Sequence, residues 1–316
     1  MGYFLGFDGG GTKTDCVILN PNGAIIGEGR GGPSNPLRSG GYDAAFTSLR
    51  EAAAAALCAA KLRADDITGV CAGLAGAGRR SVVRRMTVFL SQEFPVALTQ
   101  VVPDYEVALE GAVGGGPGVV LIAGTGSVAF GRNAAGETAR AGGYGPHIGD
   151  EGSAYEIGRR AVSAVAHSRD ADAPVTVMAE MMSAALHCPD WDELTLRIMK
   201  DPDDVFPKLF PVVAQAANAD DSAAKEIMFA SAIGLANLAM VVIRRLGMKE
   251  QAFPLVKCGG VFGRCTMLDS LLDSVLSSGA IRAKISRLEI PPAVGAALLA
   301  ARLSTAPPQQ AASHGA

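Results

Sequence analysis

Short apolar runs separated by glycine-rich turns dominate the start of the chain. Residues 3–7 and 15–19 are segments of strand length that are apolar apart from Asp15, and three consecutive glycines stand between them at positions 9–11. A third run at 24–29 follows an Asn-Gly turn, so the pattern predicts three antiparallel strands. An alanine-rich segment then predicts a helix from about Tyr42 to Lys61.

Strands and helices alternate over the next fifty residues. The pattern predicts a strand at 69–75, a helix at 79–93 and a strand at 100–103, with Asp104 at the carboxyl end of that strand. A short helix ends near Val113, and the sequence Gly-Gly-Gly-Pro at 114–117 marks a junction between two halves.

The second half begins as the first does. Apolar runs at 118–123 and 128–132 flank a Gly-Thr-Gly-Ser turn, and a third strand is predicted at 137–141. The β-turn-β-turn-β pattern therefore occurs twice, each time with glycine and threonine in the first turn. The rest of this half predicts the following elements: helices over 151–246 with a long one at 220–245, a strand at 253–258, a helix at 266–277, a strand at 284–289 and a helix at 293–303.

Composition and charge narrow the classes of function. A chain of 316 residues predicts one large or two medium domains with a substantial core. A formal net charge of -3 without a Lys/Arg block argues against nucleic acid and anionic membranes as partners. The alanine-rich runs look too interrupted for an apolar span of about 18 residues. The N-terminus lacks the features of a signal peptide, so we expect a soluble, cytoplasmic protein.

Cysteines and histidines suggest neither a disulfide framework nor a zinc site. The cysteines are Cys16, Cys58, Cys71, Cys188, Cys258 and Cys265, with no C-x-x-C spacing, and they read as reduced core residues. The histidines are His147, His167, His187 and His314, at unrelated spacings. A metal site in this chain is therefore expected to have oxygen ligands.

The first glycine turn carries chemistry suited to phosphate. Residues 9–11 allow backbone N–H groups to approach a ligand closely, while Thr12 and Thr14 add hydroxyls and Lys13 adds a positive charge. Asp8, at the carboxyl end of the first strand, is placed to hold a hydrated Mg²⁺ that neutralises phosphate charge. A glycine turn that merely closes a hairpin is the alternative.

The second turn, 124–127, belongs to the sequence Gly-Thr-Gly-Ser-Val-Ala, which matches a G-x-G-x-x-A dinucleotide fingerprint. That fingerprint requires a helix directly after it, whereas residues 128–132 alternate as a strand. We therefore reject a nicotinamide cofactor and interpret the turn as a second phosphate-facing hairpin. A Walker A motif is absent from the sequence.

Several motifs, in order and over about 300 residues, resemble those of one known family. They are Asp8 to Thr14, Ser34-Asn35, Asp104, Gly124 to Ser127, Gly142 to Gly145, Gly149 to Tyr155, Cys258 to Phe262 and Ala293 to Ala297. Together they resemble the BadF/BadG/BcrA/BcrD ATPase family, and within it the N-acetylglucosamine kinase branch of the sugar kinase and actin superfamily.

The resemblance implies an α/β fold of two actin-like (ribonuclease H-like) lobes, each a mixed five-stranded sheet with helices, and a cleft between them. The lobes would span 1–113 and 114–290, with helix 291–303 packing back onto the first and a disordered tail at 304–316. The implied reaction is phosphorylation of the 6-hydroxyl of an amino sugar by ATP and Mg²⁺. The resemblance also makes a homodimer plausible.

The resemblance assigns a role to each matching residue. Asp104 would be the general base and Asp8 would organise Mg²⁺. The remaining assignments are phosphate binding by Gly10, Gly11, Thr12, Lys13, Thr14, Gly124, Thr125, Gly126 and Ser127, adenosine contact by Gly259 and Gly260, and sugar contact by Ser34, Asn35, Asp104, Gly143, Tyr144 and Asp150.

Some of these residues have structural alternatives. Asp104 and Asp150 each precede a predicted helix and could cap it, and Asn35 could simply form a turn. Asp104 has an independent physical case, because a carboxylate at the carboxyl end of a strand can accept the proton of a sugar hydroxyl that attacks phosphorus.

One departure from the family pattern concerns the sugar. Eukaryotic N-acetylglucosamine kinases have a Trp where Tyr144 stands, so glucosamine or N-acetylmuramic acid are alternative substrates. A second branch of the family activates 2-hydroxyacyl-CoA dehydratases through an iron-sulfur cluster shared between subunits, but no cysteine here stands out as its ligand. A non-enzymatic regulator that keeps the fold is a further alternative.

Overall fold

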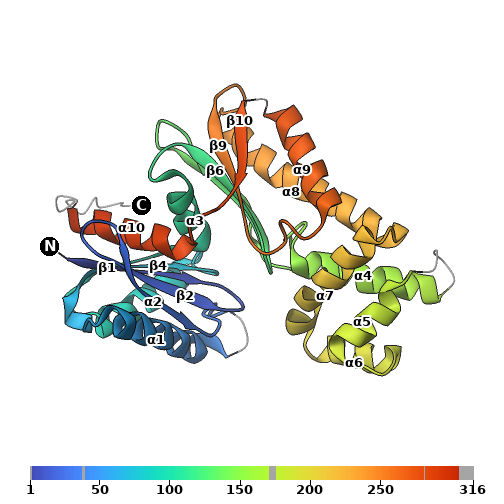
Figure 1. Cartoon of the computed structure of the whole chain (residues 1–316), viewed down its shortest axis with the longest axis horizontal. Coiled ribbons are helices and arrows are strands. Elements are labelled where there is room, and N and C mark those ends of the chain that lie inside the picture. The colour runs from blue at the N-terminus through green and yellow to red at the C-terminus, as the bar shows by residue number, and fades with distance from the viewer. Residues whose placement is uncertain (1, 38–39, 171–175, 281, 306–316) are drawn as a thin grey trace. The chain divides into compact units, whose positions relative to one another are not determined.

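The computed structural model describes residues 2–37, 40–170, 176–280 and 282–305 (Figure 1). By their contacts, the residues separate into one unit of Met1–Gly115 with Glu289–Ala316 and a second of Gly116–Leu288. The chain thus passes to the second unit after residue 115 and returns after residue 288. Each unit contains one five-stranded sheet.

The first sheet has the strand order β3-β2-β1-β4-β5. Strand β1 pairs antiparallel with β2 and parallel with β4, β2 pairs antiparallel with β3, and β4 pairs parallel with β5. The strands are β1 (Tyr3–Gly9), β2 (Thr14–Leu19), β3 (Ile25–Gly31), β4 (Ile67–Leu74) and β5 (Leu98–Pro103).

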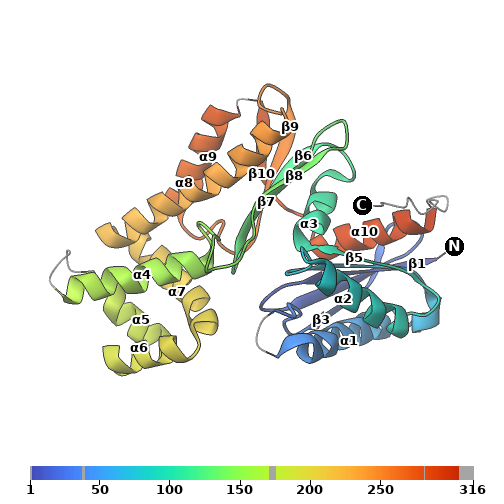
Figure 2. The same ribbon diagram turned by 180° about the vertical axis from the view of Figure 1, so that it is seen from behind.

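Helices cover both faces of this sheet, as Figures 1 and 2 show from opposite sides. They are α1 (Gly41–Ala60) and α2 (Arg80–Glu93) on one face, α3 (Asp104–Val113) and α10 (Pro292–Thr305) on the other, and a short 3₁₀ helix η1 (Ala64–Asp66) before β4. In β2, Ile18 faces the core under α1 and α2 while Val17 faces α10. Burial on both faces explains why residues 16–19 of this strand are all apolar.

Close approach of α10 to β1 depends on Gly6. A Cβ atom at this position would lie 2.2 Å from the backbone nitrogen of Ala297 and 2.3 Å from the carbonyl oxygen of Ala293. Any side chain at position 6 would therefore push the helix away from the sheet. The helix continues to Thr305, so residues 304 and 305, predicted to be disordered, are helical. The rest of that tail, 306–316, lies outside the described residues.

The second sheet has the order β10-β9-β6-β7-β8. Its strands are β6 (Gly118–Ala123), β7 (Ser127–Arg132), β8 (Thr138–Gly142), β9 (Phe253–Cys258) and β10 (Ala283–Arg287). The first three are antiparallel hairpins and the last two run parallel to β6. Both units therefore place their strands in the order third, second, first, fourth, fifth, which confirms the predicted repeat and fold class.

Helices between β8 and β10 form one large core with this sheet. They are α4 (Ala154–Arg169), α5 (Met178–Leu186), α6 (Trp191–Lys200), α7 (Pro202–Asn218), α8 (Ser222–Arg245) and α9 (Thr266–Gly279). Helix α8 contacts β6, β7 and β8, and α4 packs against α7.

Helix α8 corrects one expectation from the sequence. Its most apolar 18-residue window has a mean hydropathy of 2.0, so by length and composition it is apolar enough to cross a membrane. Half of that window is buried inside the unit, and Leu235, Ala239 and Val242 belong to its core. Core packing thus accounts for the apolar residues on the buried half of this helix.

Candidate active site

The β1–β2 turn and the loop after β3 are joined through one carbonyl group. The N–H of Gly10 donates to the carbonyl of Lys13 at 2.9 Å, which closes the turn. The carbonyl of Gly10 accepts from the N–H groups of Ser34 at 3.1 Å and Asn35 at 3.2 Å. Backbone hydrogen bonds therefore hold the first predicted phosphate turn against the predicted sugar loop.

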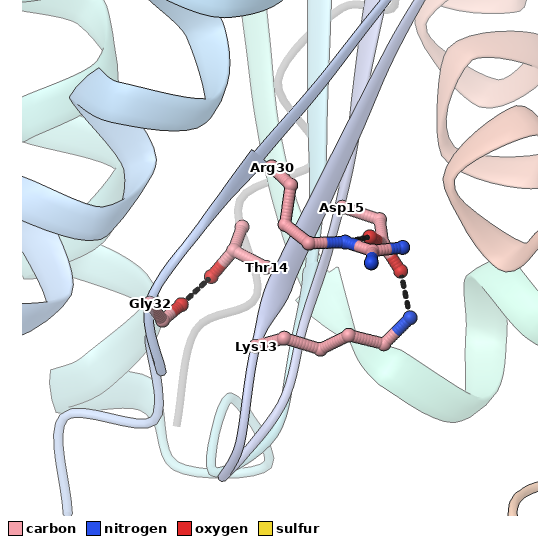
Figure 3. Close-up of polar contacts among 5 residues, drawn as sticks. All are labelled: Lys13, Thr14, Asp15, Arg30 and Gly32. Atoms are coloured by element: carbon pink, nitrogen blue, oxygen red, sulfur yellow. Dashed lines mark hydrogen bonds and ion pairs between the residues drawn. The ribbon is translucent and has the colours of Figure 1, made fainter.

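Side-chain hydroxyls strengthen this connection (Figure 3). The Thr14 hydroxyl donates to the carbonyl of Gly32 at 2.7 Å and lies 2.8 Å from Oγ of Ser34. Thr14 and Ser34 are both 0% exposed, and a Cβ atom at Gly9 would lie 2.1 Å from the Ser34 oxygen. These two hydroxyls hold the turn against the loop from inside the first unit.

Lys13 is paired with an acidic neighbour. Its Nζ contacts the carboxylate of Asp15, whose other oxygen accepts from Nε of Arg30 at 2.7 Å (Figure 3). Partial burial opposes ionisation of Asp15, but the hydrogen bonds from Lys13 and Arg30 prevail and hold its pKa below the usual value. The Lys13 side chain remains 54% exposed. The ammonium group of Lys13 is therefore solvent-accessible and already forms an ion pair with Asp15.

Asp8 and Asp104 both lie at the carboxyl ends of strands in the first sheet. Asp8 is next to last in β1, and Asp104 follows β5, with β4 between these strands. Burial raises the pKa of Asp8 to about 7, and the charges of Asp104 and Asp15 add to this effect while Lys13 opposes it. A half-buried carboxylate with two further acids nearby is stabilised by a cation, so these residues fit a hard metal ion such as Mg²⁺.

Asp104 is the first residue of α3, and the residue in the N-cap position is Pro103. One carboxylate oxygen of Asp104 accepts from the N–H of Tyr105 at 3.0 Å. The alternative in which Asp104 caps the helix is therefore wrong, although its charge does lie beside the positive end of the helix dipole.

The second turn, between β6 and β7, is fixed to the start of α4. Carbonyls of Gly124 and Thr125 accept from the N–H groups of Ala154 at 2.8 Å and Tyr155 at 3.3 Å. The Ser127 hydroxyl donates to the carbonyl of Glu151 at 2.7 Å and is almost fully buried. The residues after the turn form β7, which confirms the rejection of a dinucleotide fingerprint.

Asp150 lies against this turn. It has a left-handed backbone (φ +67°) and is 4% exposed, and a Cβ atom at Gly126 would lie 2.8 Å from its Oδ2. The cap of α4 is Ser153, which accepts from the N–H of Glu156, while the Glu156 carboxylate accepts from Gly152. Asp150 is thus not the helix cap, and a strained backbone at a buried acid is typical of functional sites.

The predicted adenosine segment lies beside the same turn. Gly259 follows β9 with φ +113°, and a Cβ atom there would lie 2.2 Å from the carbonyl oxygen of Ala123. The N–H of Val261 donates to that same carbonyl at 3.1 Å. Only glycine fits at position 259, and the close approach places the Gly259-Gly260 segment next to the residues that begin the 124–127 turn.

Tyr144 lies on the loop after β8, and its side chain is 56% exposed. The guanidinium of Arg140 lies over its ring, with 4.9 Å between Cζ and the ring centroid. The neighbouring Gly143 has φ +70°, which lets the loop turn sharply at this point.

The structure thus brings the predicted residues together in two groups. The first unit holds Asp8, Gly10, Gly11, Thr12, Lys13, Thr14, Ser34, Asn35 and Asp104, and the second holds Gly124, Thr125, Gly126, Ser127, Gly143, Tyr144, Asp150, Gly259 and Gly260. The sequence prediction missed Arg140 and the Ser153–Glu156 cap. The cap had a visible signal, because Ser-x-x-Glu before a helix is a capping box, but no sequence pattern pairs Arg140 with Tyr144.

Two sheets with one strand order and a glycine turn after each first strand define the actin-like sugar kinase fold. A solved ROK glucokinase from Streptomyces griseus shares this fold, with a TM-score of 0.62 at 16% identity, over 95% of this chain and 100% of that one. A structure from Chromobacterium violaceum, described as a candidate N-acetylglucosamine kinase, has a TM-score of 0.76 at 26% identity, over 95% and 99% of the two chains.

The chain belongs to the BadF/BadG/BcrA/BcrD ATPase family, whose model matches residues 5–300. It is 31% identical to an N-acetyl-D-glucosamine kinase of Dictyostelium discoideum, over 94% of this chain and 97% of that protein. It is 30% identical to an N-acetylmuramic acid/N-acetylglucosamine kinase of Clostridium acetobutylicum, over 95% and 98%.

Proposed function

We propose that the protein is an ATP-dependent amino-sugar kinase that transfers the γ-phosphoryl group of ATP to the 6-hydroxyl of N-acetylglucosamine. The observation that carries this proposal is the pair of acids Asp8 and Asp104, whose charges interact at the carboxyl ends of two strands of the first sheet. Similarity to two kinases of N-acetylated amino sugars over more than nine-tenths of the chain supports the choice of acceptor.

Asp104 is the proposed general base. A carboxylate at this position would accept the proton of the sugar hydroxyl as its oxygen attacks phosphorus in line with the leaving group. Its place at the first residue of α3 fixes the side chain on a rigid element, because α3 packs against α10 and against strands of the sheet.

Asp8 is the proposed Mg²⁺ residue, directly or through a bound water. When bound, Mg²⁺ would neutralise charge on the phosphate oxygens during transfer. The turns at 10–14 and 124–127 would offer backbone N–H groups to the phosphates, and Gly259 and Gly260 would lie against the adenosine. Since the Thr14 and Ser127 hydroxyls are bonded to carbonyls, we assign them to holding the turns in shape.

Asn35, Gly143, Tyr144 and Asp150 are the proposed sugar contacts. The Asn35 side-chain oxygen accepts from the N–H of Leu37 at 3.0 Å, which leaves its amide hydrogens to donate to sugar hydroxyls. Tyr144 offers an exposed aromatic face to the apolar face of a pyranose ring. We propose that Ser34, which is fully buried, acts by holding the loop.

N-acetylmuramic acid and glucosamine are the second candidates for the acceptor. A kinase of N-acetylmuramic acid and N-acetylglucosamine covers the chain at 30% identity, and a glucosamine kinase of Vibrio cholerae matches 58% of it at 31%. Because these relatives are named for N-acetylmuramic acid and glucosamine, both sugars are included in the test. A homodimer in the cytoplasm is also proposed, and light scattering of the purified protein would check its mass.

The dehydratase-activator alternative finds little support in the cysteines. An iron-sulfur cluster shared between subunits needs thiolates at a surface. Cys16, Cys71, Cys188 and Cys265 are buried, Cys258 is half-buried and Cys58 is exposed, so the expectation that all are core residues fails for Cys58. Burial raises the pKa of Cys71 to about 12, which disfavours its thiolate.

The test is ADP release with Mg-ATP and a panel of N-acetylglucosamine, glucosamine, N-acetylmuramic acid, N-acetylmannosamine and glucose. Asp104→Asn should lower kcat by about a hundredfold to ten-thousandfold, the usual contribution of a general base, while ATP still binds. Glu106→Gln, on the same turn of α3, is the charge-matched control and should keep activity near that of the wild type. Turnover unchanged in Asp104→Asn, or no turnover with any sugar, would refute the proposal.

A further inference from the structure

Arg140 is a cationic side chain that lies beside Tyr144, an exposed aromatic residue of the second unit. Arg140, on β8, has its guanidinium over the ring of Tyr144, and within the described part of the chain it forms no ion pair. The Arg140 side chain is neither fully buried nor fully exposed. Water can solvate the exposed part of such a group, but a carboxylate or phosphate would use its hydrogen-bond donors more strongly.

Stacking orients the guanidinium but leaves its donors available. The guanidinium carbon lies over the ring, 4.9 Å from its centroid, and within the described residues none of the five N–H groups donates a hydrogen bond. The Tyr144 ring therefore holds a planar fork of donors whose edge can meet a carboxylate in two parallel hydrogen bonds. A lysine at this position would lack both the flat face and the fork.

The backbone around Arg140 is also fixed. Residue 140 pairs with Phe130 of the neighbouring strand β7, and its carbonyl accepts from Nη1 of Arg245 at 2.9 Å. A Cβ atom at Gly143 would lie 4.0 Å from Nη1 of Arg140, so the guanidinium runs alongside the loop. The side chain thus begins from a rigid strand and ends beside residues 143 and 144, both proposed to contact sugar.

Neighbouring charges do not neutralise Arg140. Arg245, the residue that bonds to its carbonyl, is a second cation. On β8 and the turn before it, Glu137 accepts a hydrogen bond from the amide of Asn133 at 2.7 Å, and on the loop after β8 Asp150 is buried against Gly126. Two arginines thus meet at β8, and the one beside Tyr144 would be matched by an anionic ligand.

We propose that Arg140 is a specificity-determining residue that binds a carboxylate carried by the amino-sugar acceptor. The proposal rests on the function proposed above and on Tyr144 as a sugar contact. The class of substrate is an N-acylated amino sugar with an acidic substituent, of which the lactyl ether of N-acetylmuramic acid is an available example. A neutral amino sugar would bind the same loop without using the Arg140 fork.

Steady-state kinetics on the full chain test this assignment with two sugars that differ by the acidic substituent. Arg140→Gln should lower kcat/KM for N-acetylmuramic acid by about ten- to hundredfold, which corresponds to the loss of a charged hydrogen bond. The same variant should change kcat/KM for N-acetylglucosamine by less than about twofold. Arg140→Lys should give a kcat/KM for N-acetylmuramic acid between those of the wild type and Arg140→Gln, since lysine keeps the positive charge but not the paired N–H donors. Arg244→Gln, an exposed arginine on α8, is the charge-matched control and should leave both sugars unaffected.

Three outcomes would overturn the proposal. The first is a wild-type enzyme that phosphorylates N-acetylglucosamine but not N-acetylmuramic acid. The second is an equal loss on both sugars in Arg140→Gln, which would mean that Arg140 acts only by orienting Tyr144. The third is a calorimetric titration without ATP in which Arg140→Gln binds N-acetylmuramic acid as tightly as the wild type does. That titration does not require turnover, so it separates failure of this proposal from failure of the kinase proposal.

Discussion

Thr14 illustrates how a residue in a ligand-binding motif can work from inside the protein. Its hydroxyl is fully buried and bonded to the Gly32 carbonyl, and it lies next to the Ser34 hydroxyl. Thr14→Val should remove both bonds and lower the free energy of unfolding by about 1–3 kcal/mol, because two buried polar groups lose their partner. Urea unfolding measures the loss. Thr14→Ser keeps the hydroxyl and should recover most of the lost free energy of unfolding. A Thr14→Val variant that is as stable as the wild type but inactive would instead indicate direct contact with a ligand.

Asp8 makes stability depend on pH in the protein without metal. Its pKa is raised from the ordinary 3.8 to about 7, so between these values the folded chain binds more protons here than the unfolded chain does. The contribution of this group to stability is therefore present below about pH 4 and is lost as pH rises through 7. Asp8→Asn should flatten that part of the stability profile, as measured by urea unfolding in EDTA from pH 4 to 8. A parallel slope in wild type and variant would contradict the raised pKa.

Single residues differ in how far the sequence could predict them. Asp8 and Asp104 were placed by their positions after apolar runs, because a strand end is visible as the end of such a run. The contact of Arg140 with Tyr144 depends on where a loop folds back, and the pairing of Lys13 with Asp15 depends on side-chain orientation. Neither is encoded in hydrophobic periodicity.

The segment after β9 is held in place by the next helix, α9. Lys257, 5% exposed in β9, places its Nζ 2.6 Å from Asp273 and 3.8 Å from Asp269. Asp269 also accepts from the N–H of Gly263 at 2.7 Å, which fixes the end of the loop that contains Gly259. Through this acceptor, α9 positions the backbone proposed to contact adenosine.

Asp269→Ala should therefore weaken nucleotide binding and spare the sugar. We expect the KM for ATP to rise by about three- to tenfold, since the loop loses one charged hydrogen bond, with the KM for N-acetylglucosamine changed by less than about twofold. Asp273→Ala is the matched control, because Asp273 pairs with Lys257 one helical turn away and the described contacts give it no bond to the loop. Equal effects of both variants on ATP would show that the charge near Lys257 matters and the loop contact does not.

Elements were predictable where one strong pattern decided them. The strand at 253–258 and the helix beginning at Thr266 begin where the apolar pattern indicates. Helix α10 was predicted as an element, but its contact with β1 joins residues almost 300 positions apart, and only the glycine at position 6 hints at close approach. Long-range packing of this kind has no local signature in the sequence.

At the scale of the whole molecule, the repeat of one sheet order gives each unit its own glycine turn. The turn at 10–14 is fixed by the loop after β3, and the turn at 124–127 is fixed by α4. As proposed above, each unit thus carries its own turn with backbone donors suited to phosphate. The repeated β-turn-β-turn-β pattern was readable from the sequence, whereas the places of the fourth and fifth strands and the boundaries of the units depend on contacts across the chain.

A site completed only when the acceptor is bound should hydrolyse little ATP without sugar. Binding energy of the sugar would then be used to exclude water and to bring Asp104 to the attacking hydroxyl, as in kinases that close around their substrates. We expect ADP release without sugar to be at most about one hundredth of the rate with saturating N-acetylglucosamine.

The measurement is ADP release against sugar concentration. Xylose, a sugar that lacks the 6-hydroxymethyl group, tests whether a bound sugar is enough to assemble the reactive site. Xylose should stimulate ATP hydrolysis by water above the sugar-free rate, because it would complete the site without supplying the acceptor. An ATPase rate that is equal with and without any sugar would mean that the acceptor has no part in assembling the reactive site.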